Sequence, residues 1–240
     1  MTPLRLDEVG RFSGNFDRGL RVTRILPAPC LTDSLAGIFS LFSIVMPDRI
    51  VLLIDAQNAY MSARRVFGNP TYDPPEFGQF HPMTLASMLV TRKAGAVLDS
   101  VHVFRGRPNR HIDPRGYQAN LKQCQAWASA GVYVHARQLR YLGSKPTPAD
   151  GEEKGVDVEL AVHLVSTALR GAVDGVILFS ADTDLIPAVD EALARSSVRI
   201  EVTGWHNGKR GERLNVPGRS LWCHWLDKND YSSVEDPTQY

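Results

Sequence analysis

Five consecutive apolar residues at positions 50–54 (IVLLI) constrain the fold of this chain most strongly. An apolar run without polar alternation predicts a strand that is buried on both faces, as in the parallel sheets of α/β proteins. Further strands are predicted at residues 100–104, 132–135, 175–180, 198–203 and 221–226, and helices at residues 58–66, 84–93, 114–130, 156–169 and 184–195. Because strands and helices alternate, the sequence predicts an α/β, Rossmann-like three-layer fold with a mostly parallel sheet of five or six strands.

Composition and charge exclude several classes of protein. Hydrophobic residues make up 43% of the 240 residues and charged residues 22%, which is close to the globular average and excludes wholesale disorder or collagen. The formal net charge of +1 excludes a uniformly basic protein that coats nucleic acid, but it is compatible with a local basic groove. The three cysteines form no C-x-x-C pair and provide no disulfide framework or thiolate metal site, which favours a cytoplasmic location.

We expect three parts along the chain: an N-terminal extension at residues 1–45, a globular domain at residues 46–226, and a polar, mobile tail at residues 227–240. The apolar stretch at residues 35–46 is shorter than the roughly 20 residues that a helix needs to cross a bilayer. We therefore interpret it as a buried or loosely packed helix and expect no membrane partner. Since the sequence from Met46 onward reads as the beginning of a globular domain, we assign no function to residues 1–45.

Acidic residues follow two of the predicted strands at the point where each strand ends. Asp55 comes directly after the first apolar run, and Asp182 and Asp184 follow the strand at residues 175–180. Asp157 lies at the beginning of the helix that leads into that strand, and Asn58 lies in the first turn after Asp55. Because ligands bind outside the carboxyl ends of the strands in such sheets, we expect these side chains to converge at one edge.

Four converging carboxylates imply a cation, because like charges at close range cannot all stay ionised without one. Oxygen ligands without cysteine or clustered histidine favour Mg²⁺ or Mn²⁺ over Zn²⁺. Taken singly, Asp184 is more simply explained as a helix N-cap, and Asp157 serves equally well as a cap or a ligand. Asp55 is harder to explain without a partner, since a buried carboxylate is costly. Together the acids predict a metal-dependent site for phosphoryl chemistry.

Basic residues follow the second predicted strand, at the same edge as the acids. They are Arg105, Arg107, Arg110 and Arg115, against a single acidic residue in that segment. A basic rim beside an acidic centre suits a site that cleaves a polyanion, because the rim neutralises backbone phosphates. The alternative is a solvated arginine-rich loop. His163 lies within a mainly apolar helical segment, and we interpret it as structural.

Three blocks of the sequence resemble the signature motifs of the NYN domain, a family of PIN-like, Rossmann-type nucleases. They are residues 54–58 (IDAQN), 154–158 (KGVDV) and 179–184 (FSADTD), which are similar to the family patterns D-x-x-N, K-G-x-D and S-G-D-x-D. The resemblance spans roughly residues 48–205 and is greatest to the LabA-like branch. The chain departs from the pattern at Ala181, where the family usually has glycine, and in a longer Pro-rich insertion after the first helix.

The resemblance implies a metal-dependent ribonuclease that acts on RNA. By the family pattern, Asp55, Asp157, Asp182 and Asp184 would hold Mg²⁺ or Mn²⁺, and Asn58 would orient a ligand, a water or the phosphate. Ser180 would support the ligands through its hydroxyl, and Lys154 would contact phosphate. A homodimer also fits the family. Two alternatives stay open: a catalytically inactive RNA-binding or interaction module on the same fold, and a metal-dependent phosphohydrolase that acts on a small phosphoester.

Overall fold

A computed structural model describes residues 46–240 of the chain. The expected N-terminal extension lies outside the described residues, as does nearly all of the apolar stretch interpreted as a helix. Within residues 46–240, none of the helices is long and apolar enough to cross a membrane.

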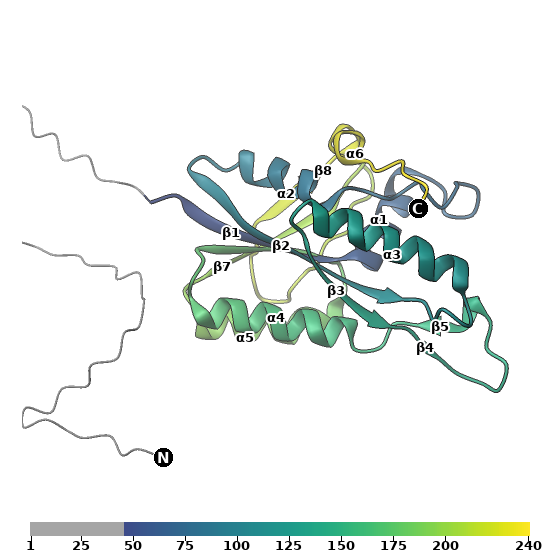
Figure 1. Cartoon of the computed structure of the whole chain (residues 1–240). Coiled ribbons are helices and arrows are strands. Elements are labelled where there is room, and N and C mark those ends of the chain that lie inside the picture. The colour runs from purple at the N-terminus through teal and green to yellow at the C-terminus, as the bar shows by residue number, and fades with distance from the viewer. Residues whose placement is uncertain (1–45) are drawn as a thin grey trace, which may run out of the picture. The chain divides into compact units, whose positions relative to one another are not determined.

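Six parallel strands form one sheet in the order β3-β2-β1-β6-β7-β8 (Figure 1). The strands are β1 (Asp48–Asp55), β2 (Ala96–Arg107), β3 (Tyr133–Gln138), β6 (Gly175–Phe179), β7 (Arg199–Trp205) and β8 (Cys223–Leu226). The predicted α/β fold with a parallel sheet is confirmed. Successive strands are added on one side of β1 and then, from β6 onward, on its other side. The carboxyl ends of β1 and β6 therefore flank the switch point where such sheets bind ligands.

Helices cover both faces of the sheet and make a three-layer structure (Figure 1). One face carries α1 (Ala56–Phe67), α2 (Pro82–Thr91), α3 (Pro114–Ser129) and α6 (Lys228–Val234), and the other carries α4 (Val156–Arg170) and α5 (Ile186–Arg195). Alternate residues of β1 enter the two hydrophobic cores: Ile50, Leu52 and Ile54 on one side, and Val51 and Leu53 on the other. Burial on both faces explains why this strand has no polar alternation.

Two regions differ from the sequence-based expectation. The predicted loop after the third strand contains a small antiparallel hairpin, β4 (Arg140–Tyr141) and β5 (Gly151–Glu152), with a 3-10 turn (η1, Pro148–Asp150) between them. The interpretation of residues 227–240 as a mobile tail is wrong, because α6 forms there. Asp227 caps this helix by accepting hydrogen bonds from the backbone N–H groups of Asn229 and Asp230. Tyr231 is fully buried and packs against Phe67, with ring centroids 5.3 Å apart.

The Pro-rich segment between α1 and α2 is organised by one buried arginine. The guanidinium of Arg64 donates hydrogen bonds of 2.6–3.0 Å to four backbone carbonyls, those of Pro70, Asp73, Pro74 and Phe77. Arg64 is only 6% exposed, and its buried charge needs hydrogen-bond acceptors. The four carbonyl oxygens provide these acceptors, and the guanidinium in turn provides the donors that the carbonyls need. This segment is thereby held beside the carboxyl edge of the sheet.

Candidate functional site

Three aspartates converge at the switch point of the sheet. Asp55 ends β1, Asp182 lies just beyond the end of β6, and Asp157 lies in the first turn of α4. One carboxylate oxygen of each lies within 4.8 Å of those of the other two. Asp184 is exposed and lies outside this group, although its charge acts on Asp157. The cap of the 3-10 turn η2 (Thr183–Leu185) is Asp182, whose Oδ1 accepts a hydrogen bond from the backbone N–H of Asp184.

Hydrogen bonds from two further residues hold Asp55 and the turn of Asp182 in place. Ser180 is buried; its Oγ donates to Asp55 Oδ2 at 3.0 Å and accepts from the backbone N–H of Asp182 at 3.1 Å. The backbone N–H of Asn58 donates to Asp55 Oδ1 at 3.0 Å. The side-chain oxygen Oδ1 of Asn58 accepts a hydrogen bond from the backbone N–H of Ala181 at 2.9 Å. Asn58 and Ser180 thus connect the turn after β1 to the turn after β6. Alanine at position 181 leaves this connection intact.

The electrostatics of the cluster favour a cation. Burial raises the pKa of Asp55 to about 7, against hydrogen bonds from Asn58 and Ser180 that lower it, and the charges of Asp157 and Glu153 add to the increase. Burial also raises the pKa of Asp157, and the charges of Asp182 and Asp184 raise it further. A divalent ion among these groups would favour their ionised forms. A donor set made of carboxylate oxygens fits Mg²⁺ or Mn²⁺.

Glu153 is a fifth acidic residue at the site, and the sequence analysis missed it. Together with Asp55, Asp157 and Asp182 it lines a shallow hollow of about 250 Å³. The backbone N–H of Gly106, near the end of β2, donates to Glu153 Oε1 at 2.6 Å. Loss of solvent around its carboxylate raises the pKa of Glu153. Its position in an irregular loop, one residue before the K-G-x-D block, is the only signal in the sequence that could have indicated it.

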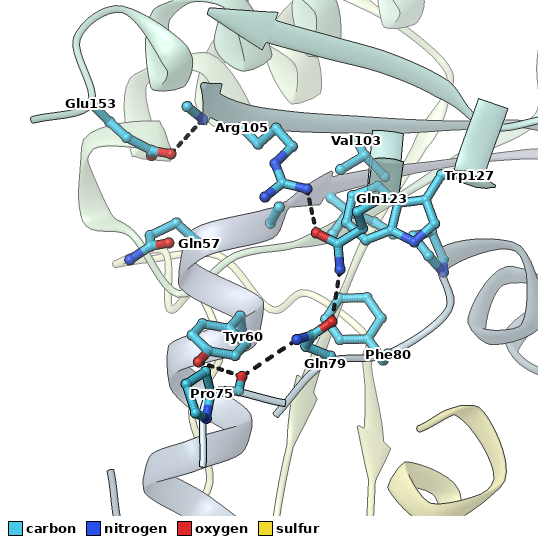
Figure 2. A pocket seen from close by; sticks show the side chains of 14 residues that line it. Gln57, Tyr60, Pro75, Gln79, Phe80, Val103, Arg105, Gln123, Trp127 and Glu153 are labelled. Carbon is cyan, nitrogen blue, oxygen red and sulfur yellow. Dashed lines mark hydrogen bonds between the residues drawn. The ribbon is translucent and has the colours of Figure 1, made fainter. Parts of the chain in front are cut away.

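A deeper pocket of about 260 Å³ adjoins the acidic hollow, and Gln57 and Glu153 line both (Figure 2). Its other polar groups form a chain in which Arg105 Nη1 donates to Gln123 Oε1 at 2.6 Å, and Gln123 Nε2 donates to Gln79 Oε1 at 2.9 Å. The pocket is also lined by the aromatic rings of Tyr60, Phe80 and Trp127. It therefore combines flat apolar surfaces with amide and guanidinium groups.

Two buried donors beside this pocket have no hydrogen-bond partner among the described residues. They are Nε of Arg105 and Nε1 of Trp127, and the guanidinium carbon of Arg105 lies 5.1 Å from the centre of the Trp127 ring. Because buried donors are normally paired, these two favour a polar ligand or water in the pocket. A third hollow, of about 370 Å³, again includes Gln57 and Glu153 and extends toward Asn120 on α3. The three hollows are therefore neighbours that share Gln57 and Glu153.

The four predicted arginines occupy different environments. Arg105 is packed inside the pocket and does not stand on an open rim. Arg107 is half-buried, with Nε 3.4 Å from Asn120 Oδ1. Arg110 and Arg115 are exposed, and Arg110 Nε donates to the side chain of the adjacent His111. Lys154 is exposed as well, on the loop that leads into α4.

A profile of the NYN domain matches residues 49–215. The chain belongs to the NYN domain family. This assignment implies a PIN-like nuclease fold, and NYN domains are typically nucleases that depend on a divalent metal. No curated protein matches the sequence. A crystallised protein of unknown function from Vibrio parahaemolyticus RIMD 2210633 is similar at 19% identity, with a TM-score of 0.42 over 66% of this chain and 82% of that chain.

The three signature blocks of this NYN domain are far apart in the sequence and meet in the structure. The first block supplies Asp55 and Asn58, the second supplies Asp157, and the third supplies Ser180 and Asp182. The matched region also includes Glu153 and every residue that lines the acidic hollow. The fold of this NYN domain therefore brings a cluster of acids together at the switch point of the sheet.

Proposed function

We propose that this NYN domain is a metal-dependent ribonuclease that hydrolyses phosphodiester bonds of RNA. One observation carries the proposal: carboxylate oxygens of Asp55, Asp157 and Asp182 lie within 4.8 Å of one another at the switch point of a parallel sheet. This spacing suits a shared ion, and the oxygen donors suit Mg²⁺ or Mn²⁺.

Each residue of the site has a role that follows from its contacts. Asp55, Asp157 and Asp182 would hold the ion, while Asp184 is exposed and raises the pKa of Asp157 through its charge. The bound ion would supply a water of lowered pKa and would neutralise the charge that develops on the phosphate. Ser180 keeps Asp55 and the turn of Asp182 in place, and the Asn58 side chain holds the turn at Ala181. The exposed ammonium of Lys154 is available to a phosphate.

Single-stranded RNA fits these neighbouring hollows better than a duplex does. Protein sites that accept unpaired bases combine aromatic rings for stacking with polar groups that bond the base edges. The pocket next to the acids provides Tyr60, Trp127 and the Gln79–Gln123–Arg105 chain. We therefore place one unpaired base in this pocket, with its phosphate at the acids. The exposed Arg110 and Arg115 would contact the backbone further along.

Cleavage of labelled, partly structured RNA in Mn²⁺, in Mg²⁺ and in EDTA tests the proposal. We expect cleavage with either metal and none in EDTA, and loss of cleavage in Asp55→Asn and in Asp182→Asn. Asp190→Asn is the matched control, because it makes the same chemical change on α5, where the carboxylate pairs with Arg219. Cleavage that persists in both site variants would refute the assignment.

Two other outcomes would favour the alternatives. RNA that is retained by the protein but left intact would indicate an inactive RNA-binding module. With neither cleavage nor binding of RNA, the enclosed pocket of about 260 Å³ would favour a phosphohydrolase that acts on a small phosphoester. Hydrolysis of a chromogenic aryl phosphodiester, with the same three variants, would then separate that activity from a contaminating one.

Three finer assignments are supported by the sequence alone. The LabA-like branch is supported by the three signature blocks, and a cytoplasmic location by three cysteines that form no C-x-x-C pair. A homodimer is supported only by the frequent dimerisation of PIN-like nucleases and by the apolar residues of the N-terminal extension. Sedimentation of the full chain, compared with a chain that begins at Met46, would test the last of these.

A further inference from the structure

A second group of possible metal ligands lies away from the acids, on the face of the sheet that α4 covers. His102 lies in β2, His135 in the neighbouring β3, and His163 in α4. One ring nitrogen of each lies within 4.8 Å of those of the other two. The sequence analysis found no clustered histidine and interpreted His163 as structural, because residues so far apart in the sequence meet only through the fold.

Strand register brings the first two imidazoles together. His102 is paired with Tyr133, and His135 is paired with Phe104, so the two histidines are diagonal neighbours on the same face of the sheet. The phase of α4 then places His163 over them, with its ring centroid 4.3 Å from that of His102 and 5.2 Å from that of His135. Three rigid elements therefore converge on one point.

The distance between the two strand histidines suits a shared ion. His102 Nδ1 lies 3.1 Å from His135 Nε2, and the planes of the two rings differ by 22°. Two imidazole nitrogens bound to one tetrahedral Zn²⁺ at about 2.0–2.1 Å lie about 3.3–3.4 Å apart. The separation of these two nitrogens is therefore close to that in such a site, and a bound ion would replace their direct contact.

The outward-facing nitrogens of the same two rings have polar partners. His102 Nε2 lies 3.1 Å from Ser100 Oγ, and His135 Nδ1 lies 3.6 Å from Glu159 Oε1. Each ring therefore turns one nitrogen inward to the other histidine and the other nitrogen outward to a hydroxyl or a carboxylate. In metal sites this outer contact fixes the tautomer and the orientation of a ligating histidine.

The three rings are accessible, and each offers an imidazole nitrogen as the donor atom. All three are partly buried on the face of the sheet that α4 covers. Imidazole nitrogens favour Zn²⁺, Cu²⁺ or Ni²⁺ over Mg²⁺. Three imidazoles with a remaining position for water make a donor set that Zn²⁺ accepts.

We propose that His102, His135 and His163 form a second metal site, which binds Zn²⁺ or a similar transition-metal ion independently of the acidic hollow. Such an ion would tie α4 to β2 and β3. Since α4 also carries Asp157 in its first turn, the site would stiffen the helix that presents one of the acids. The proposal does not depend on the nuclease assignment.

Zinc titration of the full chain, purified without a polyhistidine tag and first stripped with a chelator, tests this site. We expect one equivalent of Zn²⁺ to bind in the presence of excess Mg²⁺, and binding to persist in the Asp55→Asn/Asp182→Asn double variant. His163→Gln should weaken the affinity at least about 10-fold, a loss typical of changes at metal sites. His111→Gln, in an exposed loop, is the matched control and should leave the affinity unchanged.

Two further readouts keep the test decisive if a variant folds poorly. Co²⁺ bound to the unmodified chain should show visible absorption of a tetrahedral ion with nitrogen ligands, and Zn²⁺ should raise its melting temperature. Zinc binding that is unchanged in His163→Gln and in His102→Gln would overturn the proposal. So would binding that is lost in the aspartate double variant but kept in the histidine variants.

Discussion

The acidic hollow and the histidine cluster both take a residue from α4, yet they differ in how the chain assembles them. The aspartates follow strand ends or begin a helix, and every such position in a parallel α/β sheet faces the same edge. The histidines come from the middle of two strands and the middle of a helix. Edge sites are therefore fixed by topology, whereas a site on a sheet face also depends on register and helix phase.

The largest expected effect separates the two clusters directly. Asp182→Asn removes a carboxylate from the acidic group, so we expect RNA cleavage to fall by at least about 1,000-fold, or roughly 4 kcal/mol of barrier. The affinity of the histidine cluster for Zn²⁺ should not change. His163→Gln should show the reverse pattern, with cleavage within a few fold of the unmodified protein. The measurements are the initial cleavage rate and the zinc affinity of each variant. A variant that loses both cleavage and zinc binding would show that the clusters are coupled.

A second prediction concerns the support of the acids. Ser180→Ala removes the hydroxyl that donates to buried Asp55 and accepts from the N–H of Asp182. We expect the free energy of unfolding to fall by about 1–3 kcal/mol, because the buried Asp55 carboxylate and the partly buried N–H of Asp182 lose their partner. Affinity for Mn²⁺ should also fall, by about 10–100-fold. Ser196→Ala removes a hydroxyl that bonds only Ala192 O, and it serves as the control in denaturant melts and metal titrations.

A third polar cluster shows how a buried carboxylate is stabilised without any metal. Burial acts to raise the pKa of Glu201, but hydrogen bonds from His224 and Lys93 outweigh it and lower the pKa to about 2. A lowered pKa in the folded state adds stability above the unfolded value of 4.5, and this stability is lost as the pH falls from there toward 2. For this ion-paired carboxylate we expect about 1–2 kcal/mol.

Melts of the unmodified chain and of Glu201→Gln at pH 7 and at pH 3 would measure this contribution. The stability difference between the two proteins should shrink as the pH falls. A difference that is the same at both values would show that Glu201 contributes through packing and not through its charge.

The smallest expected effect lies at the exposed arginines. Removing one phosphate contact from single-stranded RNA lowers the slope of log affinity against log salt by about 0.7. We expect this change for Arg110→Ala and for Arg115→Ala, with little change in the cleavage rate at saturating RNA. Arg195→Ala, on α5 in a surface ion pair with Glu191, is the control for a lost exposed charge. An unchanged slope in both variants would mean that RNA follows another path.

The sequence predicted those parts of the fold and the candidate site that depend on local pattern. An apolar run that ends in Asp55 defines both a buried strand and the place where its carboxylate emerges. The parallel sheet and the grouping of Asp55 with Asp157 and Asp182 follow from repeated positions of this kind. Asp184 has the same sequence signal but lies exposed beside the group, because the 3-10 turn η2 carries it past the edge.

Features set by tertiary contact could not be predicted in this way. Glu153 is placed by a hydrogen bond from Gly106, across 47 residues of sequence, and nothing in its own segment indicates that contact. Arg105 lies inside a pocket because it donates a hydrogen bond to Gln123 and packs against the ring of Trp127. In the sequence, nothing distinguishes it from the other three predicted arginines. Helix α6 forms because Tyr231 finds a buried place among other aromatic rings. The sequence of α6 is short and polar, and it has no apolar periodicity that would predict a helix.

The single arginine that gathers four carbonyls of the Pro-rich segment has a consequence for how such a domain can vary. Arg64 fixes the middle of the segment, and the wall that Pro75 and Gln79 give to the pocket lies next to the fixed carbonyls. We therefore expect that residues gained or lost between these carbonyls and the helices would leave that wall in place. The length of this insertion can therefore vary, while the guanidinium of Arg64 on α1 keeps the shape of the pocket wall constant.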